Sequence, residues 1–204
     1  MRTRLVVSIL VVLFAAVPVV SVGDVGATTV PTCDGIPATK WLTTSGKLTG
    51  TSGPDVLVGT EGVDSIYGLS GDDLICTHPD GSSSTDDDLV YGGNGNDTIW
   101  DLEGDEGAAY GGAGNDLIYS ASYSDGGSGD DSLNAIGPSV RFRGGSGNDS
   151  LNGNAGEPSA DDLSGGSGDD VIQDGGGADK IDGGSGFDTC VDSDGGDTKR
   201  GCEA

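Results

Sequence analysis

Six nonapeptides in this chain repeat the pattern Gly-Gly-x-Gly-x-Asp-x-apolar-x; they begin at Gly92, Gly111, Gly126, Gly144, Gly165 and Gly183, the last with Cys190 in the apolar position. The glycines permit backbone conformations with positive φ, which leave carbonyl oxygens free to face a cation, and the sixth position adds a carboxylate. The last three residues predict a short strand whose middle side chain points inward. The pattern therefore predicts a series of cation-binding turns joined by short strands.

This nonapeptide resembles the calcium-binding repeat of the RTX, or haemolysin-type, family, and the resemblance extends from Gly50 to Cys202. It implies an all-β fold, a right-handed parallel β-roll of about eight coils with capped ends. In such a roll two nonapeptides form one coil, so alternate units stack on the same edge. It also implies that a calcium ion lies between successive turns of one edge and takes oxygen ligands from both.

Sorting the units by this alternation separates a regular edge from an irregular edge. On the regular edge every unit has an aspartate at the sixth position, and the candidate calcium ligands are Asp55, Asp73, Asp97, Asp116, Asp131, Asp149, Asp170 and Asp188. Every insertion, deletion and missing aspartate falls on the irregular edge, where the same position holds Asp64, Asp88, Asp161, Asp179 and Asp197. Val140 and a short unit at Ser120 interrupt this second series, so ions are expected there only from Asp161 to Asp197.

Several calcium ions are the expected cofactor. Calcium is favoured over magnesium because a flexible glycine turn suits long bonds and six or more oxygen ligands. The inward positions supply only a thin row of apolar side chains, and stacked aspartates repel one another. Metal binding and folding are therefore expected to be one equilibrium.

The first 27 residues have the order of a secretory signal: Arg2 and Arg4, an apolar run from Leu5 to Val20, and small or aliphatic residues before Thr28. We expect cleavage before Thr28 and a secreted, extracellular protein. A retained membrane anchor is the alternative, but the run contains Ser8 and Pro18 and is shorter than the ~20 residues of a span. We expect no membrane span after cleavage.

The chain is strongly acidic, with a net charge of −25. Loss of two arginines and Asp24 with the signal would make it −26, which excludes nucleic acid as a partner. Acidic, glycine-rich chains with few aromatic residues are often disordered. Here the acids recur in register with the glycines, which favours a folded repeat.

Four cysteines in an exported chain indicate disulfides, with free buried thiols as the alternative. Pairing of Cys33 with Cys76 and of Cys190 with Cys202 is favoured, because the distant ends of a solenoid cannot meet in one molecule. Residues 28–49 are expected to cap the N-terminal end of the core with Trp41 and Leu48, and residues 50–204 to form the β-roll with its C-terminal cap.

We expect a calcium-binding protein with a structural or binding role at or near the cell surface, and not an enzyme. The single histidine, His78, is expected in a solvated polar loop. An alternative is an accessory or adhesion module for another secreted protein or a surface glycan, because Trp100 and Tyr119 occupy outward positions on neighbouring coils. Ice binding is not supported, since the outward positions form no threonine ladder.

Overall fold

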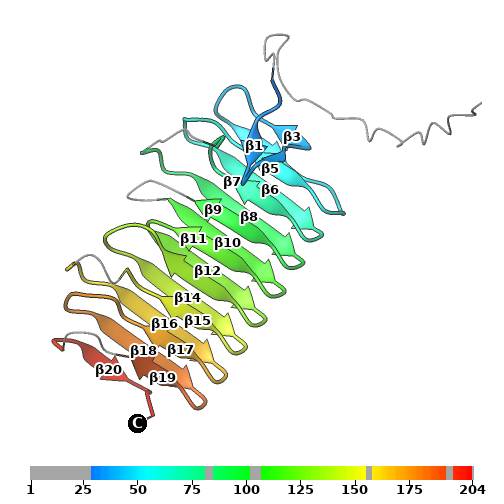
Figure 1. The fold of residues 1–204 in the computed structure, drawn as a ribbon. Helices are drawn as coiled ribbons and strands as arrows, with labels where there is room; N and C mark the ends of the chain where they lie inside the picture. The colour runs from blue at the N-terminus through cyan, green and yellow to red at the C-terminus, as the bar shows by residue number, and fades with distance from the viewer. Residues whose placement is uncertain (1–28, 81–84, 102–106, 155–157, 192–194, 204) are drawn as a thin grey trace, which may run out of the picture.

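The computed structural model describes residues 29–203 apart from 81–84, 102–106, 155–157 and 192–194. The predicted signal lies outside the described residues. Within them the chain winds into a parallel β-solenoid of about eight turns, whose coils stack along one axis from the N-terminal end to the C-terminal end (Figure 1). The predicted all-β parallel roll is thus confirmed. None of the described segments forms a helix with the length and hydrophobicity of a membrane span.

Two parallel sheets form the walls of the solenoid, and each has nine strands within the described residues. The long-strand sheet contains β4 (Lys47–Thr49), β6 (Ser65–Ser70), β8 (Leu89–Asn94), β10 (Ala108–Ala113), β12 (Tyr123–Ser128), β14 (Arg141–Ser146), β16 (Asp162–Ser167), β18 (Lys180–Ser185) and β20 (Thr198–Arg200). The short-strand sheet contains β3 (Lys40–Trp41), β5 (Val56–Val58), β7 (Leu74–Cys76), β9 (Thr98–Asp101), β11 (Leu117–Ser120), β13 (Ser132–Ala135), β15 (Ser150–Asn152), β17 (Val171–Gln173) and β19 (Thr189–Val191).

The core is a double row of side chains between these sheets. Successive strands pair in register, so that one inward residue of each strand stacks on the next, as Leu133 does on Leu151 and Phe142 on Leu163. The buried row of the short-strand sheet is Leu57, Ile75, Ile99, Ile118, Leu133, Leu151 and Ile172, with Cys190 packed at its end. The facing row contains Leu48, Ile66, Val90, Ala109, Phe142, Leu163 and Ile181. Apart from Leu48, which was expected in the N-terminal cap, these are the inward positions predicted from the repeat.

Two buried residues in units of the irregular edge were not predicted. Ser124 lies in the facing row between Ala109 and Phe142 and is fully buried. Val140 stands at a sixth position of the irregular edge and packs into the core with 4 % of its surface exposed. In this unit an apolar side chain therefore takes the place of the missing aspartate.

The N-terminal end is closed by the segment before Gly50. Strands β3 and β4 extend the two sheets by pairing with β5 and β6. A hairpin of β1 (Thr32–Cys33) and β2 (Ile36–Pro37) precedes them, and Cys33 forms a disulfide with Cys76. Around this disulfide Ala38, Trp41 and Val58 form a second small apolar cluster.

The C-terminal end is closed by a second disulfide, between Cys190 and Cys202. Residue Glu203 continues the short-strand sheet by an isolated parallel bridge to Thr189. Both disulfides are the pairs expected from the sequence, and the described residues contain no free cysteine.

Candidate calcium-binding turns

Each turn of the regular edge connects a long strand to a short strand, and the turn from Gly144 to Asp149 represents the six perfect repeats. Gly145 and Gly147 adopt positive φ values of 116° and 126°, a conformation that glycine adopts readily. The chain then enters β15, and Asp149 directs its side chain inward with only 2 % of the residue exposed. The local sequence thus forms a tight turn that ends on a buried carboxylate.

The buried aspartates of this edge form a continuous hydrogen-bonded ladder. The backbone N–H of Asp131 donates to Oδ1 of Asp149 at 2.8 Å, and the N–H of Asp149 donates to Oδ1 of Asp170 at 2.8 Å. The same bond links every successive pair of the regular-edge aspartates: Asp55, Asp73, Asp97, Asp116, Asp131, Asp149, Asp170 and Asp188. The structure therefore brings all eight predicted ligands of this edge into one column.

The Oδ2 atom of each ladder aspartate, which takes no part in the ladder hydrogen bonds, is suited to bind a cation. Oδ2 is buried and accepts no hydrogen bond from the described residues in seven of the aspartates: Asp73, Asp97, Asp116, Asp131, Asp149, Asp170 and Asp188. A buried ionised oxygen without a partner is costly. Seven such atoms in a row call for a counter-charge.

The first glycine of each turn lies where these oxygens converge. A Cβ atom at residue 144 would lie 2.6 Å from the carbonyl oxygen of Gly165 in the next turn, and closer still to Oδ2 of Asp149. Gly92, Gly111 and Gly165 face the corresponding pair of oxygens in the same way. Carboxylate and carbonyl oxygens from two successive turns therefore meet beside each first glycine, and an all-oxygen donor set suits calcium.

The first sixth-position aspartate of each edge, Asp55 or Asp64, has hydrogen-bond partners for its second carboxylate oxygen. Oδ2 of Asp55 accepts hydrogen bonds from the backbone N–H and the hydroxyl of Thr51, at 2.6 and 2.8 Å. Oδ2 of Asp64 is held in the same way by Thr60, at 2.6 and 3.0 Å. In these two aspartates the Oδ2 atom therefore accepts hydrogen bonds from the protein. The Oδ2 atoms of the later regular-edge aspartates have no such donor among the described residues.

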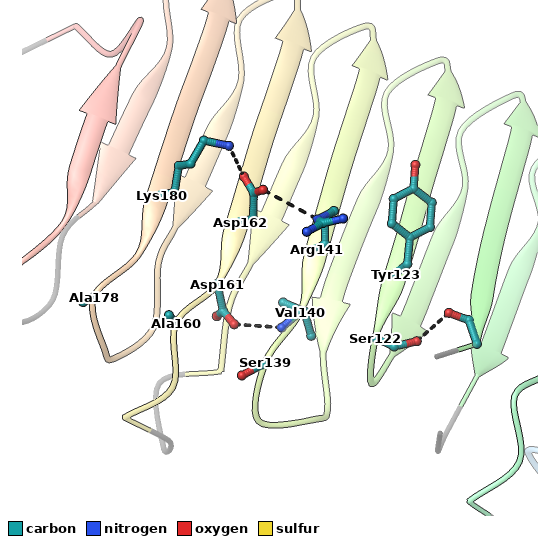
Figure 2. Close-up of a pocket in the computed structure, with 11 residues that line it drawn as sticks. Ser122, Tyr123, Ser139, Val140, Arg141, Ala160, Asp161, Asp162, Ala178 and Lys180 are labelled. Atoms are coloured by element: carbon teal, nitrogen blue, oxygen red, sulfur yellow. Dashed lines mark hydrogen bonds and ion pairs between the residues drawn. The ribbon is translucent and has the colours of Figure 1, made fainter. Parts of the chain in front are cut away.

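The irregular edge carries a broken version of the ladder. The backbone N–H of Asp64 donates to Oδ1 of Asp88, but the next three turns place Gly107, Ser122 and Val140 at the sixth position. The ladder resumes at Asp161, whose Oδ1 accepts from the N–H of Val140 at 2.9 Å (Figure 2). A shallow hollow of about 490 Å³ lies over this gap, where Ser122 donates to the carbonyl of Gly107.

Beyond the gap the structure places three carboxylates together. The backbone N–H of Asp161 donates to Oδ1 of Asp179, and the N–H of Asp179 donates to Oδ1 of Asp197. One oxygen each of Asp174, Asp179 and Asp197 lie within 4.8 Å of one another. The predicted run from Asp161 to Asp197 is thus contiguous, and Asp174 is an additional carboxylate that the repeat pattern does not indicate.

His78 does not lie in a solvated loop, so that prediction is wrong. Only 1 % of the residue is exposed; its Nδ1 lies 3.1 Å from the hydroxyl of Thr77 and its Nε2 lies 3.7 Å from Oδ2 of Asp88. The backbone N–H of Thr77 pairs with Trp100, which draws the start of the inserted loop onto the next coil. The histidine is therefore packed at the irregular edge beside the ladder.

Burial raises the pKa of the ladder carboxyls. The pKa is about 7 for Asp97 and Asp131 and about 6 for Asp73 and Asp149. Burial is the largest cause, the backbone hydrogen bond from the preceding aspartate opposes it, and neighbouring carboxylates add to it. Keeping these groups ionised in the folded chain is therefore unfavourable without a cation.

Without calcium, acid is therefore expected to favour the folded chain. A carboxyl whose pKa rises on folding contributes stability that is complete below its unfolded pKa of about 3.9 and is lost as the pH rises through its folded pKa. For the ladder that loss falls around the pKa values of about 6 to about 7. In chelator, circular dichroism should report more β-structure at about pH 5 than at about pH 7.5, and the opposite trend would contradict this.

The outward aromatic residues stack on one another. Trp100 and Tyr119 have ring centroids 4.0 Å apart and planes 6° apart, and Trp100 also packs against the N-terminal apolar cluster. Both are half-buried, not exposed as expected from their outward positions. Tyr67, Tyr91 and Tyr110 form a similar stack at 5.0 Å spacing on the other sheet. Faces used in such stacks are not offered to a sugar, so this packing does not favour the glycan hypothesis.

Several residues of the site were missed by the sequence analysis. Glu203 ends the regular ladder, because its carboxylate accepts from the N–H of Asp188 at 2.5 Å and its N–H donates to the carbonyl of Asp188. On the outer surface a second row of hydrogen bonds links the fifth positions, as from the N–H of Asn148 to Oδ1 of Asp130. The recurrence of Asn or Asp at that position was the signal that could have revealed this row.

A parallel β-roll with buried carboxylates aligned between its turns defines a class of metal-binding solenoid. A family model for the RTX calcium-binding nonapeptide repeat, in four copies, matches residues 49–78, 82–106, 109–122, 141–157 and 158–190, which is more than half of the chain. The protein belongs to this family of calcium-binding repeats, which is a structural and not a catalytic family. No curated protein matched the chain in a separate comparison.

Proposed function

We propose that this protein is a secreted calcium-binding β-roll with a structural role at or near the cell surface. The observation that carries the calcium assignment is the row of seven buried Oδ2 atoms without hydrogen-bond partners along the regular edge. Each lies beside a first glycine, and most face the carbonyl oxygen of the next turn. A calcium ion between two turns would neutralise the carboxylates and link one coil to the next.

Two features support export. The N-terminal sequence has the order of a secretory signal, and two disulfides close the ends of the solenoid. Disulfides persist in oxidising compartments and are rare in the cytosol. Millimolar calcium outside cells would fill even weak sites.

Counting bound ions tests the proposal. Native mass spectrometry of the full-length product, exported and folded in millimolar calcium, should show several calcium ions per chain, and magnesium should not replace them. The same spectra should show a mass corresponding to a chain that begins near Thr28. A chain that binds no calcium would overturn the assignment, and an uncleaved, retained chain would overturn the proposed location.

A further inference from the structure

Basic side chains gather on one part of the long-strand sheet. The chain has nine lysines and arginines, and seven remain once Arg2 and Arg4 are set aside. Five of these seven lie in β14, β18 and β20: Arg141, Arg143, Lys180, Lys199 and Arg200. The C-terminal end of this sheet therefore carries most of the positive charge of a strongly acidic chain.

The strand register places these side chains in two columns on the outer face of the sheet. Arg141 of β14 pairs with Asp162 of β16, which pairs with Lys180 of β18 (Figure 2). Two residues farther along the same strands, Arg143 pairs with Ser164. Side chains two residues apart on a strand point to the same face. Arg141 and Arg143 are both exposed, so this face is the outer one.

A hollow of about 330 Å³ lies between the two columns, and all of its lining residues belong to β14, β16 and β18. Arg141, Arg143 and Lys180 contribute its basic groups, and Asp162 contributes an acidic one. Ser164 stands next to Arg143 in its column, and its small side chain leaves space beside the guanidinium group. The hollow is therefore open to solvent and lined mainly by long charged side chains.

The two arginines of β14 keep their hydrogen-bond donors available. Nε of Arg141 lies 3.6 Å from Oδ2 of Asp162, which is too far for a hydrogen bond. Arg143 forms no ion pair with any residue that the structure describes. Both guanidinium groups can thus donate to a ligand in the hollow.

The acidic residues of the hollow are paired with other cations. Oδ1 of Asp162 lies 2.7 Å from Nζ of Lys180, and the carboxylate of Asp182 is paired with the guanidinium group of Arg200. The four basic and two acidic side chains around the hollow leave an excess of two positive charges, which belong to Arg141 and Arg143. This local charge is opposite to that of the whole chain and favours an anion.

We propose that this hollow binds an oxyanion, the carboxylate or sulfate group of an acidic ligand, through Arg141 and Arg143. A guanidinium group presents planar, paired donors that match the oxygens of such an anion. The two residues are ~7 Å apart on one strand, so their long side chains can reach the same group. The hydroxyl of Ser164 adds a donor. An exposed ion pair is weak, so Arg141 can leave Asp162 for the ligand at little cost.

Titration with sodium sulfate and, separately, with sodium succinate tests the proposal. The folded protein is kept in millimolar calcium, with sodium chloride holding the ionic strength constant, and is followed by ¹⁵N nuclear magnetic resonance. The side-chain Nε–H signals of Arg141 and Arg143 should shift and reach saturation with at least one of the two anions. The anion that binds more tightly identifies the group as sulfate or carboxylate.

Three substitutions make the test specific. Arg143→Gln should weaken binding by about tenfold or more, because charge-assisted hydrogen bonds are lost. Arg143→Lys keeps the charge but not the paired donors, and should also weaken binding if Arg143→Gln does not fold. Asp162→Asn should strengthen binding several-fold, since it removes the carboxylate that repels the anion.

Lys47→Gln is the matched control. Lys47 is an exposed cation on the outer face of the same sheet, at its N-terminal end, so its loss should leave the affinity unchanged. If Lys47→Gln and Arg143→Gln weaken binding equally, the anions respond only to the general charge of the protein and the proposal fails. Shifts that do not saturate with either anion would also overturn it. Neither result bears on the calcium sites, because this hollow lies on the sheet and shares no residue with the aspartate ladders.

Discussion

Removal of calcium is expected to unfold the solenoid at neutral pH. The core is only a double row of side chains, and the ladder holds buried carboxylates at the spacing of parallel strands. At an effective dielectric constant of about 20, two like charges about 5 Å apart repel by about 3 kcal/mol. Backbone N–H donors oppose this effect, but burial and the neighbouring carboxylates still raise the pKa of Asp97 and Asp131 to about 7, so the repulsion is largely uncompensated once calcium is removed.

Far-ultraviolet circular dichroism of the disulfide-bonded protein should therefore lose most of its β-sheet signal in chelator and regain it at millimolar calcium. The midpoint of the transition should shift with calcium concentration, because a ligand that binds only the folded state stabilises it by mass action. Magnesium at the same concentration is the control and should restore little, since it demands tight octahedral geometry. A β-rich spectrum that chelator leaves unchanged would contradict the coupling of binding to folding.

Gly144→Ala is expected to be among the most damaging single substitutions. The backbone of Gly144 does not have positive φ, so alanine meets no conformational penalty there. The added Cβ would instead lie 2.6 Å from the carbonyl oxygen of Gly165 and would collide with Oδ2 of Asp149. Overpacking of this kind typically lowers the free energy of unfolding by about 1–3 kcal/mol. Because the oxygen cluster is also disrupted, we expect a loss of stability of about 3 kcal/mol or more.

Gly46→Ala is the matched control. An added Cβ at Gly46 meets no atom within 4 Å, and its φ is also compatible with alanine. Such a replacement usually stabilises a protein by roughly 0.4–1 kcal/mol, because it restricts the unfolded chain. Urea unfolding in calcium should thus show a lower free energy of unfolding for Gly144→Ala and a slightly higher one for Gly46→Ala. Equal effects would mean that the first glycine is required only for local flexibility.

The parts of the fold that recur in every turn could be predicted from the sequence. The inward positions, the column of regular-edge aspartates and the two sheets all depend on the nonapeptide pattern, and every regular-edge unit from Gly92 onward keeps that pattern although the interval between units varies. The disulfide partners followed from the same reasoning, because only cysteines near one end can meet.

The parts that depend on insertions could not be predicted. His78 follows Cys76 at the start of an inserted loop and is buried beside Asp88, and the nonapeptide pattern does not describe such a loop. Asp174 is brought to Asp179 and Asp197 by the register of strands in neighbouring coils, which its own nonapeptide does not reveal. Thr51 and Thr60 satisfy their aspartates through a local turn that the family pattern does not include. Thr51 and Thr60 hydrogen-bond to aspartates of their own repeats, whereas His78 and Asp174 each have a decisive partner in a neighbouring unit, Asp88 and Asp197 respectively.

The aspartate ladder also has a polarity. Every bond runs the same way: the N–H of one turn donates to the carboxylate of the turn that follows it in sequence. Each turn therefore accepts the hydrogen bond of the preceding turn's aspartate N–H and leaves its own aspartate N–H to be accepted by the next turn. Glu203 accepts the donor of Asp188, so a glutamate takes the place that an aspartate has in the preceding turns. Loss of the final residues would thus leave the solenoid with an open end to which another strand could add.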